Sequence, residues 1–472
     1  MSAIPFVKWK VDRAMAIRKL LVANRGEIAV RIIRAAKELG IKTVQAVSAA
    51  DREMMAARLA DEIVEIGAAH ATKSYLNREA LVEAALRCGA DAVHPGYGFL
   101  SENADFAAAV VSAGLTFVGP APETIRSMGD KACARECAIK AGVPVVPGSD
   151  GRLLNLDDAI PLAESIGYPI MIKAAAGGGG RGIRVANSVA ELQILLPQAS
   201  AEAKASFGDG GLYLEAFISQ ARHVEVQILG DGKNVVHLYE RECSLQRRRQ
   251  KVWEEAPASF LPPDLRREMC ASAVRLALEV SYRGAGTVEY LYDQRRERFY
   301  FIEMNTRIQV EHPVSEMITG IDIVREMIRI AAGEPLSVVQ SEVAAKGHAI
   351  EVRINAEDPA ANFRPAPGKI SGLQLPGGAG VRFDTMLYVG YTIPPYYDSL
   401  LGKLIVCDQS REAALNRLQR ALGELRVEGV PTTISLHQEL AQNEDVRAGC
   451  FDTAWLEKWL GQSLQHNERS QA

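Results

Sequence analysis

The chain has 472 residues, with 54 Lys and Arg, 58 Asp and Glu and a formal net charge of −4. The near balance of charge gives no basis for nucleic-acid binding, and no uninterrupted apolar run reaches the roughly 18 residues of a membrane span. At roughly 150 residues per domain, we expect about three domains.

The first residues lack the apolar block of a secretory signal, so we expect a cytoplasmic protein. Residues 1–14 are predicted to be a loose extension, and residues 461–472 a frayed polar tail. The seven cysteines are scattered and contain no C-x-x-C pair, which favours free thiols over disulfides or a zinc site. The eight histidines also lack metal-binding spacing, so oxygen ligands must hold any bound metal.

In chain order, residues 19–24 are predicted to form a strand, 25–40 a helix and 42–48 a second strand. The segments 92–98 and 116–120 have the pattern of further strands that end in turn residues. Strands and helices in alternation indicate a parallel α/β sheet. The sequence N-R-G-E replaces G-x-G-x-x-G after the first strand, which argues against a nicotinamide site.

From about residue 145 to 217 the pattern predicts a smaller unit, with a helix near 157–166. Its Gly-rich segment lies between two strand-like runs and is predicted to be a mobile hairpin flap. From residue 222 to about 358 the chain is rich in strands, and residues 286–305 form a predicted hairpin. The remainder mixes strands with two helices.

The glycine loop, residues 177–182, offers backbone N–H groups that a phosphate can approach closely. It does not match the P-loop pattern, because Lys173 precedes the glycines instead of following them. A flexible linker is the alternative interpretation, but the position of Lys173 at the mouth of the loop favours phosphate binding.

The predicted hairpin is strongly acidic. A turn centred near Arg296 places Glu289 opposite Glu303, and Thr287 opposite Asn305. Two carboxylates so close repel unless a cation neutralises them, and Mg²⁺ suits such oxygen ligands. The alternative is a solvated strand face with both carboxylates in water, and a register shift of one residue would also remove the argument.

The same face continues as a polar row. At period two from the hairpin it reads Glu303, Asn305, Arg307, Gln309 and Glu311. The Arg307 guanidinium presents a planar fork to a small oxyanion, and Glu311 is a candidate general base. For each side chain taken alone, the alternative is a surface salt bridge.

Two further polar segments stand out. The basic run at residues 246–251 lies between strand-like segments of an acidic chain, which favours bound phosphate or internal ion pairs over nucleic acid. In residues 351–358, alternation places Glu351, Arg353 and Asn355 on one face.

These motifs together resemble the biotin carboxylase family of the ATP-grasp superfamily. The resemblance rests on HPGYGFLSEN (94–103), GDK (129–131), the glycine loop, QRRRQK (246–251) and FIEMNTRIQVEHP (301–313). It covers about residues 17–459, with the motifs in the family's order.

The resemblance implies an α/β ATP-grasp fold with an N-terminal Rossmann-like domain, a mobile flap domain and a C-terminal α+β biotin carboxylase domain. The implied segments are 15–130 for the N-terminal domain, 131–217 for linker and flap, 218–345 for metal and bicarbonate, and 346–460 for the C-terminal domain. The implied reaction joins bicarbonate and MgATP into carboxyphosphate and transfers the carboxyl group to N1 of carrier-bound biotin.

The resemblance also implies a role for each matching residue. The ATP ligands would be Lys131, Lys173, Gly179, Gly180, Glu215, Ala216, Phe217, Ile218, His223, Gln246, Arg249, Glu289 and Glu303. The ligands of two Mg²⁺ or Mn²⁺ ions would be Glu289, Glu303 and Asn305. The bicarbonate pocket would consist of Lys251, Arg307, Gln309, Val310 and Glu311, with Glu311 as its base. Arg353 would stabilise the biotin enolate, and Tyr97 would lie near the biotin ring. The catalytic residues would thus be Lys251, Arg307, Glu311 and Arg353.

Three residues depart from the family's pattern. Arg249 replaces a histidine near the ribose, Ala216 replaces a lysine of the adenine hinge, and Ala176 replaces a glycine of the loop. We expect activity to survive all three. Arg249 is expected to change nucleotide affinity or to form an ion pair with a carboxylate such as Glu215.

The implied partners are a biotin carboxyl carrier protein and carboxyltransferase subunits on separate chains, and the implied assembly is a homodimer. Acetyl-CoA carboxylase is the expected parent system, with pyruvate, another acyl-CoA or a urea-type acceptor left open. Two rival hypotheses are another ATP-grasp ligase and a non-catalytic nucleotide-binding subunit.

Overall fold

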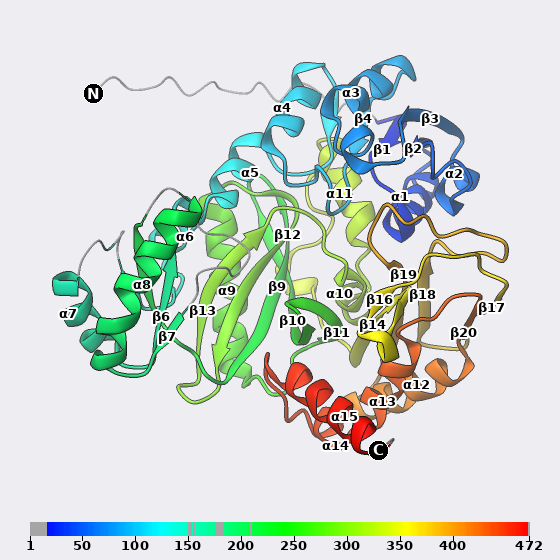
Figure 1. Ribbon diagram of the computed structural model, residues 1–472. Helices are drawn as coiled ribbons and strands as arrows, with labels where there is room; N and C mark the ends of the chain where they lie inside the picture. The colour runs from blue at the N-terminus through cyan, green and yellow to red at the C-terminus, as the bar shows by residue number, and fades with distance from the viewer. Residues whose placement is uncertain (1–16, 150–152, 154–155, 175–183, 208–209, 471–472) are drawn as a thin grey trace, which may run out of the picture. The chain divides into compact units, whose positions relative to one another are not determined.

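The computed structural model of the protein describes residues 17–149, 153, 156–174, 184–207 and 210–470 (Figure 1). The chain forms two compact units. The first consists of Met1–Gly142, His223–Glu289 and Glu303–Ala472, and the second of Val143–Arg222 and Tyr290–Ile302. The predicted N-terminal extension and the glycine loop lie outside the described residues.

A parallel sheet opens the first unit, in the order β3-β2-β1-β4-β5. Its strands are β1 Lys19–Val22, β2 Lys42–Ser48, β3 Glu62–Gly67, β4 Ala92–His94 and β5 Thr116–Phe117. The accompanying helices are α1 Gly26–Glu38, α2 Met55–Leu59, α3 Arg78–Arg87, α4 Ala104–Ser112 and α5 Pro122–Gly129, with the 3₁₀ turn Ala71–Lys73. The predicted parallel α/β unit is confirmed.

Both faces of this sheet are covered, which explains the continuous apolar run of β1. Leu20 packs in one core with Ile28 of α1, whereas Leu21 packs in another with Leu81 of α3 and Phe106 of α4. A strand buried on both faces needs apolar residues at every position. This requirement ends where β1 and β4 end, and the polar loops begin there.

The central sheet has eight strands in the order β13-β12-β9-β10-β11-β14-β19-β18. Their bounds are β9 Ala221–Asp231, β10 Val235–Arg247, β11 Gln250–Ala256, β12 Arg283–Asp293, β13 Arg298–Asn305, β14 His348–Asn355, β18 Val381–Thr385 and β19 Leu400–Asp408. The pairs from β9 to β18 are antiparallel. The hairpin β12–β13 forms as predicted, and the Asp293 carboxylate caps its turn by accepting from the N–H of Arg295 at 3.0 Å.

Helices and short strands complete the first unit. They are α6 Lys131–Lys140, α9 Pro263–Glu279, α10 His312–Thr319, α11 Ile323–Ala331, α12 Arg411–Glu424, α13 Ile434–Gln442, α14 Glu444–Ala448 and α15 Trp455–Ser470, the 3₁₀ turns Gln340–Glu342 and Pro359–Ala361, and the strand pairs β15 Glu357–Asp358 with β16 Arg364–Pro365 and β17 Gly372–Gln374 with β20 Arg426–Glu428. A core of Val352, Leu404, Leu418 and Leu440 packs α12 and α13 against β14 and β19.

The C-terminal tail differs from the prediction, because α15 continues to Ser470 where a frayed segment was expected. Its first turns are anchored by buried Leu456 and by the stacked rings of Trp455 and Trp459, whose centroids lie 5.8 Å apart. Once a helix is nucleated, each further residue adds a hydrogen bond, so a polar sequence can extend it.

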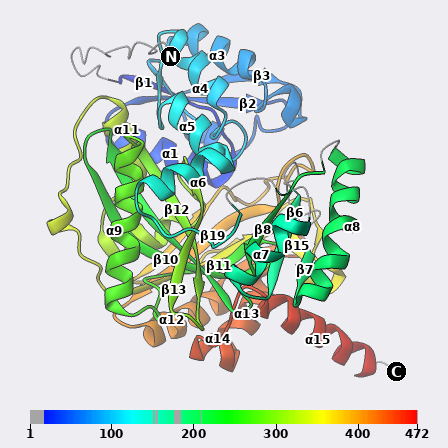
Figure 2. The same ribbon diagram turned by 90° about the vertical axis from the view of Figure 1, so that its left-hand side faces the viewer.

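The second unit contains a three-stranded antiparallel sheet in the order β7-β6-β8, packed against two helices (Figure 2). Its elements are α7 Leu156–Ile166, β6 Ile170–Ala174, β7 Arg184–Ala186, α8 Val189–Phe207 and β8 Leu212–Ala216. Strands β6 and β7 pair on either side of the glycine loop, as a hairpin requires. The mobility of that hairpin remains a prediction.

In the part of the chain that the structure describes, no helix combines the length and apolar character needed to span a bilayer. All seven cysteines are free thiols, as the sequence predicted.

Candidate active site

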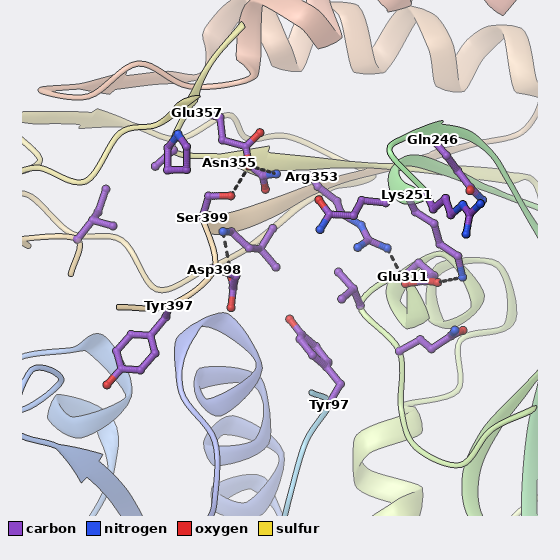
Figure 3. Close-up of a pocket in the computed structure, with 18 of the residues that line it drawn as sticks. Tyr97, Gln246, Lys251, Glu311, Arg353, Asn355, Glu357, Tyr397, Asp398 and Ser399 are labelled. Carbon is purple, nitrogen blue, oxygen red and sulfur yellow. Dashed lines mark hydrogen bonds and ion pairs between the residues drawn. The ribbon is translucent and has the colours of Figure 1, made fainter. Parts of the chain in front are cut away.

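A cavity of about 650 Å³ lies in the first unit. Its walls come from the turn between β10 and β11, from β12, β13 and β14, from residues 305–311, and from the loop 393–400 before β19. Figure 3 shows Lys251, Glu311 and Arg353 on one side of this space, with Tyr97 nearby. The volume is that of a site for a small ligand.

Lys251 is the centre of the charged cluster. Its ammonium lies 2.5 Å from Glu225 Oε2, 2.7 Å from Glu311 Oε1 and 3.0 Å from Glu289 Oε1. Burial alone would lower the pKa of Lys251, but the three carboxylates raise it well above its usual range. The side chain is therefore a buried, fully charged ammonium whose three donors are all used.

Glu289 carries most of the hydrogen bonds in the predicted metal cluster. Its carboxylate accepts from Asn305 Nδ2 at 2.9 Å and from Gln309 Nε2 at 2.8 Å, and it lies 3.0 Å from His223 Nε2. Burial works against the charge, yet Lys251 and His223 hold the pKa of Glu289 well below its usual range. Glu289 is thus an anion already surrounded by donors.

Glu303 lies in the same cavity and has the opposite electrostatic character. Burial raises its pKa, the Glu289 carboxylate adds to the rise, and Lys131 partly offsets both. Glu303 thus lies near a second carboxylate, Glu289, without a cation among the described residues that fully balances its charge. A divalent cation bound between such carboxylates would supply that charge. The oxygen donor set of Glu289, Glu303 and Asn305 therefore fits Mg²⁺ or Mn²⁺, and the predicted pairing of Glu289 opposite Glu303 stays a prediction.

Among the described residues, His223, Glu225 and Glu289 also place possible ligand atoms within 4.8 Å of one another. This second cluster shares only Glu289 with the predicted set. Glu225 is already paired with Arg241 at 2.7 Å and with Lys251. These ion pairs account for its buried charge without a metal.

The predicted polar row lines the cavity with all five of its members, Glu303, Asn305, Arg307, Gln309 and Glu311. Strand β13 ends at Asn305, so the alternation continues into a segment that is no longer a strand. Met304 and Ile308, on the other face, are buried in the protein interior.

Arg307 is held by a residue to which the sequence assigned no role. Its Nε donates to Glu102 Oε2 at 2.8 Å, and its Nη2 donates to Asn305 Oδ1 at 3.0 Å. Glu102 also accepts from the N–H of Thr306 at 3.2 Å, which ties the loop after β4 to the end of β13. Glu102 and Arg307 are 205 residues apart in the sequence, so no local pattern could have predicted this pair.

Glu311 lies between two cations. Besides Lys251, it contacts Arg353 Nη2 at 2.9 Å through its other oxygen. Burial opposes its ionisation, but Lys251 and Arg353 hold its pKa well below its usual range. Glu311 is therefore ionised and able to accept a proton once a bound anion takes over its cations.

Arg353 projects from β14 into the cavity and is bound on its far side by Glu254 of β11, with Nε at 2.6 Å from Oε1. Its carbonyl accepts from His437 Nε2 at 2.7 Å and from Thr433 Oγ1 at 3.1 Å. Of the three residues predicted to share one face of this strand, Arg353 and Asn355 line the cavity and Glu351 does not. Glu351 is fully buried, and burial raises its pKa well above its usual range.

Tyr97 reaches the cavity from the loop after β4, and its hydroxyl donates to Glu27 of α1. Glu27 lies 3.2 Å from the ammonium of the buried Lys403, which donates to the Val310 carbonyl at 2.7 Å. Neither Glu27 nor Lys403 was identified from the sequence, because each lies in a largely apolar segment.

The other predicted nucleotide ligands are distributed over both units. Gln246 donates to the Cys243 carbonyl at 2.8 Å and lies 3.0 Å from His223 Nδ1. Arg249 lines the cavity from the β10–β11 turn, with a positive φ of 64°. Lys131 begins α6, whose first turn is capped by the Asp130 carboxylate.

In the second unit, Lys173 of β6 forms an ion pair with Glu215 of β8. Ala216 and Ile218 are buried beside Tyr300, and the N–H of Phe217 donates to the Pro169 carbonyl at 2.9 Å. Gly179 and Gly180 lie outside the described residues. The anticipated partner of Arg249, Glu215, is thus engaged by Lys173.

Three family models match the chain in succession. They are the biotin carboxylase N-terminal domain over residues 16–125, the ATP-binding domain of the carbamoyl-phosphate synthase L chain over 130–339, and the biotin carboxylase C-terminal domain over 351–458. The ATP-binding model is named after carbamoyl-phosphate synthase. The models on both sides of it are those of biotin carboxylase.

A biotin carboxylase from Pseudomonas aeruginosa is 55% identical over 447 residues, which cover 94% of this chain and 99% of that protein. Among solved structures, the biotin carboxylase domain of Hydrogenobacter thermophilus 2-oxoglutarate carboxylase, a dimer with MgADP, ADP and bicarbonate, matches with a TM-score of 0.85 and 49% identity. The biotin carboxylase subunit of a pyruvate carboxylase matches with a TM-score of 0.86 and 50% identity. Each structural match covers 94% of this chain and 98% of the other.

Proposed function

Because this chain belongs to the biotin carboxylase family, we propose that its cavity is the place where bicarbonate is activated and biotin is carboxylated. The enzyme is an ATP-dependent ligase that uses Mg²⁺ and takes biotin as its substrate. The observation that carries the proposal for the cavity is the position of Glu311, an ionised carboxylate held between Lys251 and Arg353. Bicarbonate and ATP are both anions, so their reaction requires cations that offset the repulsion between them and a base nearby.

We assign the bicarbonate site to Lys251, Arg307, Gln309 and the N–H of Val310. Bicarbonate is a poor nucleophile, so it must lose its proton as it attacks the γ-phosphate of ATP. Glu311 is the proposed acceptor of that proton. When Lys251 and Arg307 turn their donors to the bound anion, their hold on neighbouring carboxylates weakens and the basicity of Glu311 rises.

The proposed metal site consists of Glu289, Glu303 and Asn305, with two ions as the expected number. When bound there, Mg²⁺ or Mn²⁺ would neutralise charge on the phosphates of ATP. Around the site, His223 and Gln309 hold the Glu289 carboxylate in place through the contacts at 3.0 and 2.8 Å.

The biotin side of the site is assigned to Arg353 and Tyr97. The proposed sequence is carboxyphosphate formation, release of CO₂ and phosphate, removal of the biotin N1 proton by that phosphate, and attack on CO₂. The enolate oxygen that develops on biotin needs a positive partner, which Arg353 provides. Glu254 and Glu311 hold its guanidinium from two sides.

The remaining nucleotide contacts are proposed for Lys131, Lys173, Gly179, Gly180, Glu215, Ala216, Phe217, Ile218, His223, Gln246 and Arg249. We keep the segments 15–130, 131–217, 218–345 and 346–460 as the proposed domains. The matches to biotin carboxylases over nearly the whole chain support both assignments.

The partner is proposed to be a biotinylated carrier protein, with a carboxyltransferase as the next enzyme and a homodimer as the assembly. Acetyl-CoA carboxylase remains the first candidate for the parent system. Its rivals are the pyruvate and 2-oxoglutarate carboxylases whose biotin carboxylase parts resemble this chain. A cytoplasmic location is retained as a prediction.

The test of the proposed function is ATP hydrolysis by the purified chain in the presence of Mg²⁺ and bicarbonate, with and without free biotin. We expect biotin to stimulate hydrolysis. Bicarbonate-dependent hydrolysis that biotin leaves unchanged would show that the cavity activates bicarbonate for another acceptor. Purified carrier proteins from the three candidate systems, compared as substrates, would identify the parent enzyme.

A further inference from the structure

Arg241 of β10 is a buried arginine with every donor in use. Its side chain is fully buried, and each of its five N–H groups faces a separate acceptor. The acceptors are Glu225 Oε1 at 2.7 Å from Nε, Gln227 Oε1 at 2.7 Å and Ser315 Oγ at 3.0 Å from Nη1, and Thr287 Oγ1 at 3.1 Å and Gln309 Oε1 at 2.8 Å from Nη2.

The acceptors come from four parts of the chain. Two belong to β9, one to β12, one to α10, and the last to the segment between β13 and α10. Burial alone would lower the pKa of Arg241, but the Glu225 and Glu311 carboxylates raise it, so the guanidinium stays charged. The planar guanidinium thus fixes its five acceptors relative to one another beside the proposed bicarbonate site, which is called the anion pocket below.

The contact with Gln309 determines which end of its amide faces the cavity. A guanidinium has no acceptor, so it can face only the amide oxygen. The NH₂ group must then point the opposite way, where it donates to Glu289 Oε1 at 2.8 Å. The two ends of a glutamine amide have nearly the same shape, so a half-turn of the amide about its last side-chain bond exchanges donor and acceptor, and the contact with Arg241 opposes that turn.

The same arginine also acts on Lys251. Its Nε binds Glu225 Oε1, and the other oxygen of this carboxylate contacts the Lys251 ammonium at 2.5 Å. Both side chains that Arg241 reaches in this way, Gln309 and Lys251, line the cavity. Arg241 itself is not among the residues of the cavity wall.

We propose that Arg241 is a positioning residue for the anion pocket, which keeps the donor end of Gln309 and the ammonium of Lys251 directed at bicarbonate. The proposal rests on the function proposed above for these two residues. If the Gln309 amide turned over, its oxygen would face the anion and repel it. Arg241 therefore contributes to bicarbonate affinity without touching bicarbonate.

Arg411 provides a control, because it is a partly buried arginine, with 14% of its side chain exposed, whose partners all lie away from the cavity. It binds both oxygens of Glu255, at 2.6 and 2.8 Å, and the carbonyls of Val446 and Arg447. A purely structural role for Arg241 predicts that the two arginines respond alike to the same substitution.

The first measurement compares Arg241→Lys with Arg411→Lys. Lysine keeps the charge but offers three donors in place of the five-donor fork. We expect Arg241→Lys to raise the KM for bicarbonate by about tenfold or more, with the KM for ATP changed less than about twofold, as loss of one charge-assisted contact implies. Arg411→Lys should lower the melting temperature and leave both KM values unchanged. Equal effects of the two variants on the KM for bicarbonate would overturn the proposal.

A double-mutant cycle then tests the route through Gln309. Gln309→Ala should raise the KM for bicarbonate in the native chain and add less than about twofold in the Arg241→Lys background, because coupled residues are not additive. The same factor in both backgrounds would overturn the proposal while leaving the role of Gln309 intact. No effect of Gln309→Ala in the native chain would instead refute the proposed function of Gln309, and the inference with it.

If Arg241→Lys does not fold, Ser315→Ala replaces it. This change removes one acceptor of Arg241 and leaves the fork and the cavity wall in place. We expect a rise of about two- to threefold in the KM for bicarbonate with an unchanged KM for ATP. An unchanged KM for bicarbonate would count against the proposal.

Discussion

Two adjacent glutamates of β11, Glu254 and Glu255, lie on opposite faces of the central sheet. Glu254 faces the cavity side, where Oε1 binds Arg353 and Oε2 has no partner among the described residues. Glu255 faces the other way, where its two oxygens bind Arg411, His348 and the indole of Trp253. One peptide bond thus separates an incompletely paired carboxyl from a saturated one.

The two environments shift the pKa in opposite directions. Burial raises the pKa of Glu254 to about 7, since Arg353 only partly compensates and Glu311 adds repulsion. Burial acts on Glu255 too, but Arg411 and His348 hold its pKa well below the usual range. Equal burial therefore stabilises the fold at Glu255, where the charge is fully paired, and leaves Glu254, where it is not, able to change its protonation state and its partners.

The largest effect should come from Glu311→Gln, which removes the proposed base on the cavity side. We expect kcat for bicarbonate-dependent ATP hydrolysis to fall by about 10²–10⁴-fold, the usual contribution of a general base. Steady-state kinetics with ATP binding measured in parallel will check this. A variant that keeps more than half of the native kcat would remove Glu311 from the mechanism.

The next largest effect should come from Glu255→Ala, which removes the only carboxylate bound to the partly buried Arg411 among the described residues. We expect the free energy of unfolding to fall by about 3–5 kcal/mol. Below its melting temperature, the variant should keep the native KM for bicarbonate, because Glu255 does not line the cavity. Denaturant titration measures the first quantity and kinetics the second. A large rise in the KM would contradict the division between the two faces.

The melting temperature as a function of pH should distinguish the two glutamates. The folded pKa of Glu254 lies above its ordinary value of 4.5, so between pH 4.5 and about 7 the folded state binds more protons and stability falls as the pH rises. The folded pKa of Glu255 is lowered, so its contribution is present above 4.5 and is lost as the pH falls below it. We expect Glu254→Gln to flatten the change in melting temperature between pH 4.5 and 7.

Glu255→Gln is the matched control for that measurement, and it should retain the slope between pH 4.5 and 7 while losing the acid-side transition. An unchanged slope in Glu254→Gln would mean that other groups titrate in this window.

The smallest effect should come from Glu102→Gln on the exposed rim. Glu102 pairs with Arg307 at 2.8 Å but is 42% exposed, so solvent screens the pair. We expect kcat/KM for bicarbonate to fall by about two- to fivefold. A loss as large as that of Glu311→Gln would show that Arg307 depends on Glu102 for its position.

The elements and residues found from the sequence share one property, which is a strong local pattern. Alternation placed Glu303 to Glu311 on one face, and the structure brings all of these residues to the cavity wall. The parallel sheet was readable from apolar runs that end in turns, whereas the helix over the C-terminal tail was not, because its anchoring residues precede it.

The residues that the sequence missed act over long separations. Arg241 reaches Ser315 across 74 positions, and Lys403 reaches Val310 across 93. Neither strand sequence shows which distant acceptor its charged residue binds. Only the folded sheet shows that these cations are buried and what they hold.

The most direct test of the central claim is the transfer of labelled bicarbonate to free biotin by the native chain, by Glu311→Gln and by Glu255→Gln, at a temperature where all three are folded. We expect label in carboxybiotin for the native chain and for Glu255→Gln, and its loss in Glu311→Gln. Labelled biotin formed equally well by all three, or the loss of transfer in Glu255→Gln alone, would contradict that claim.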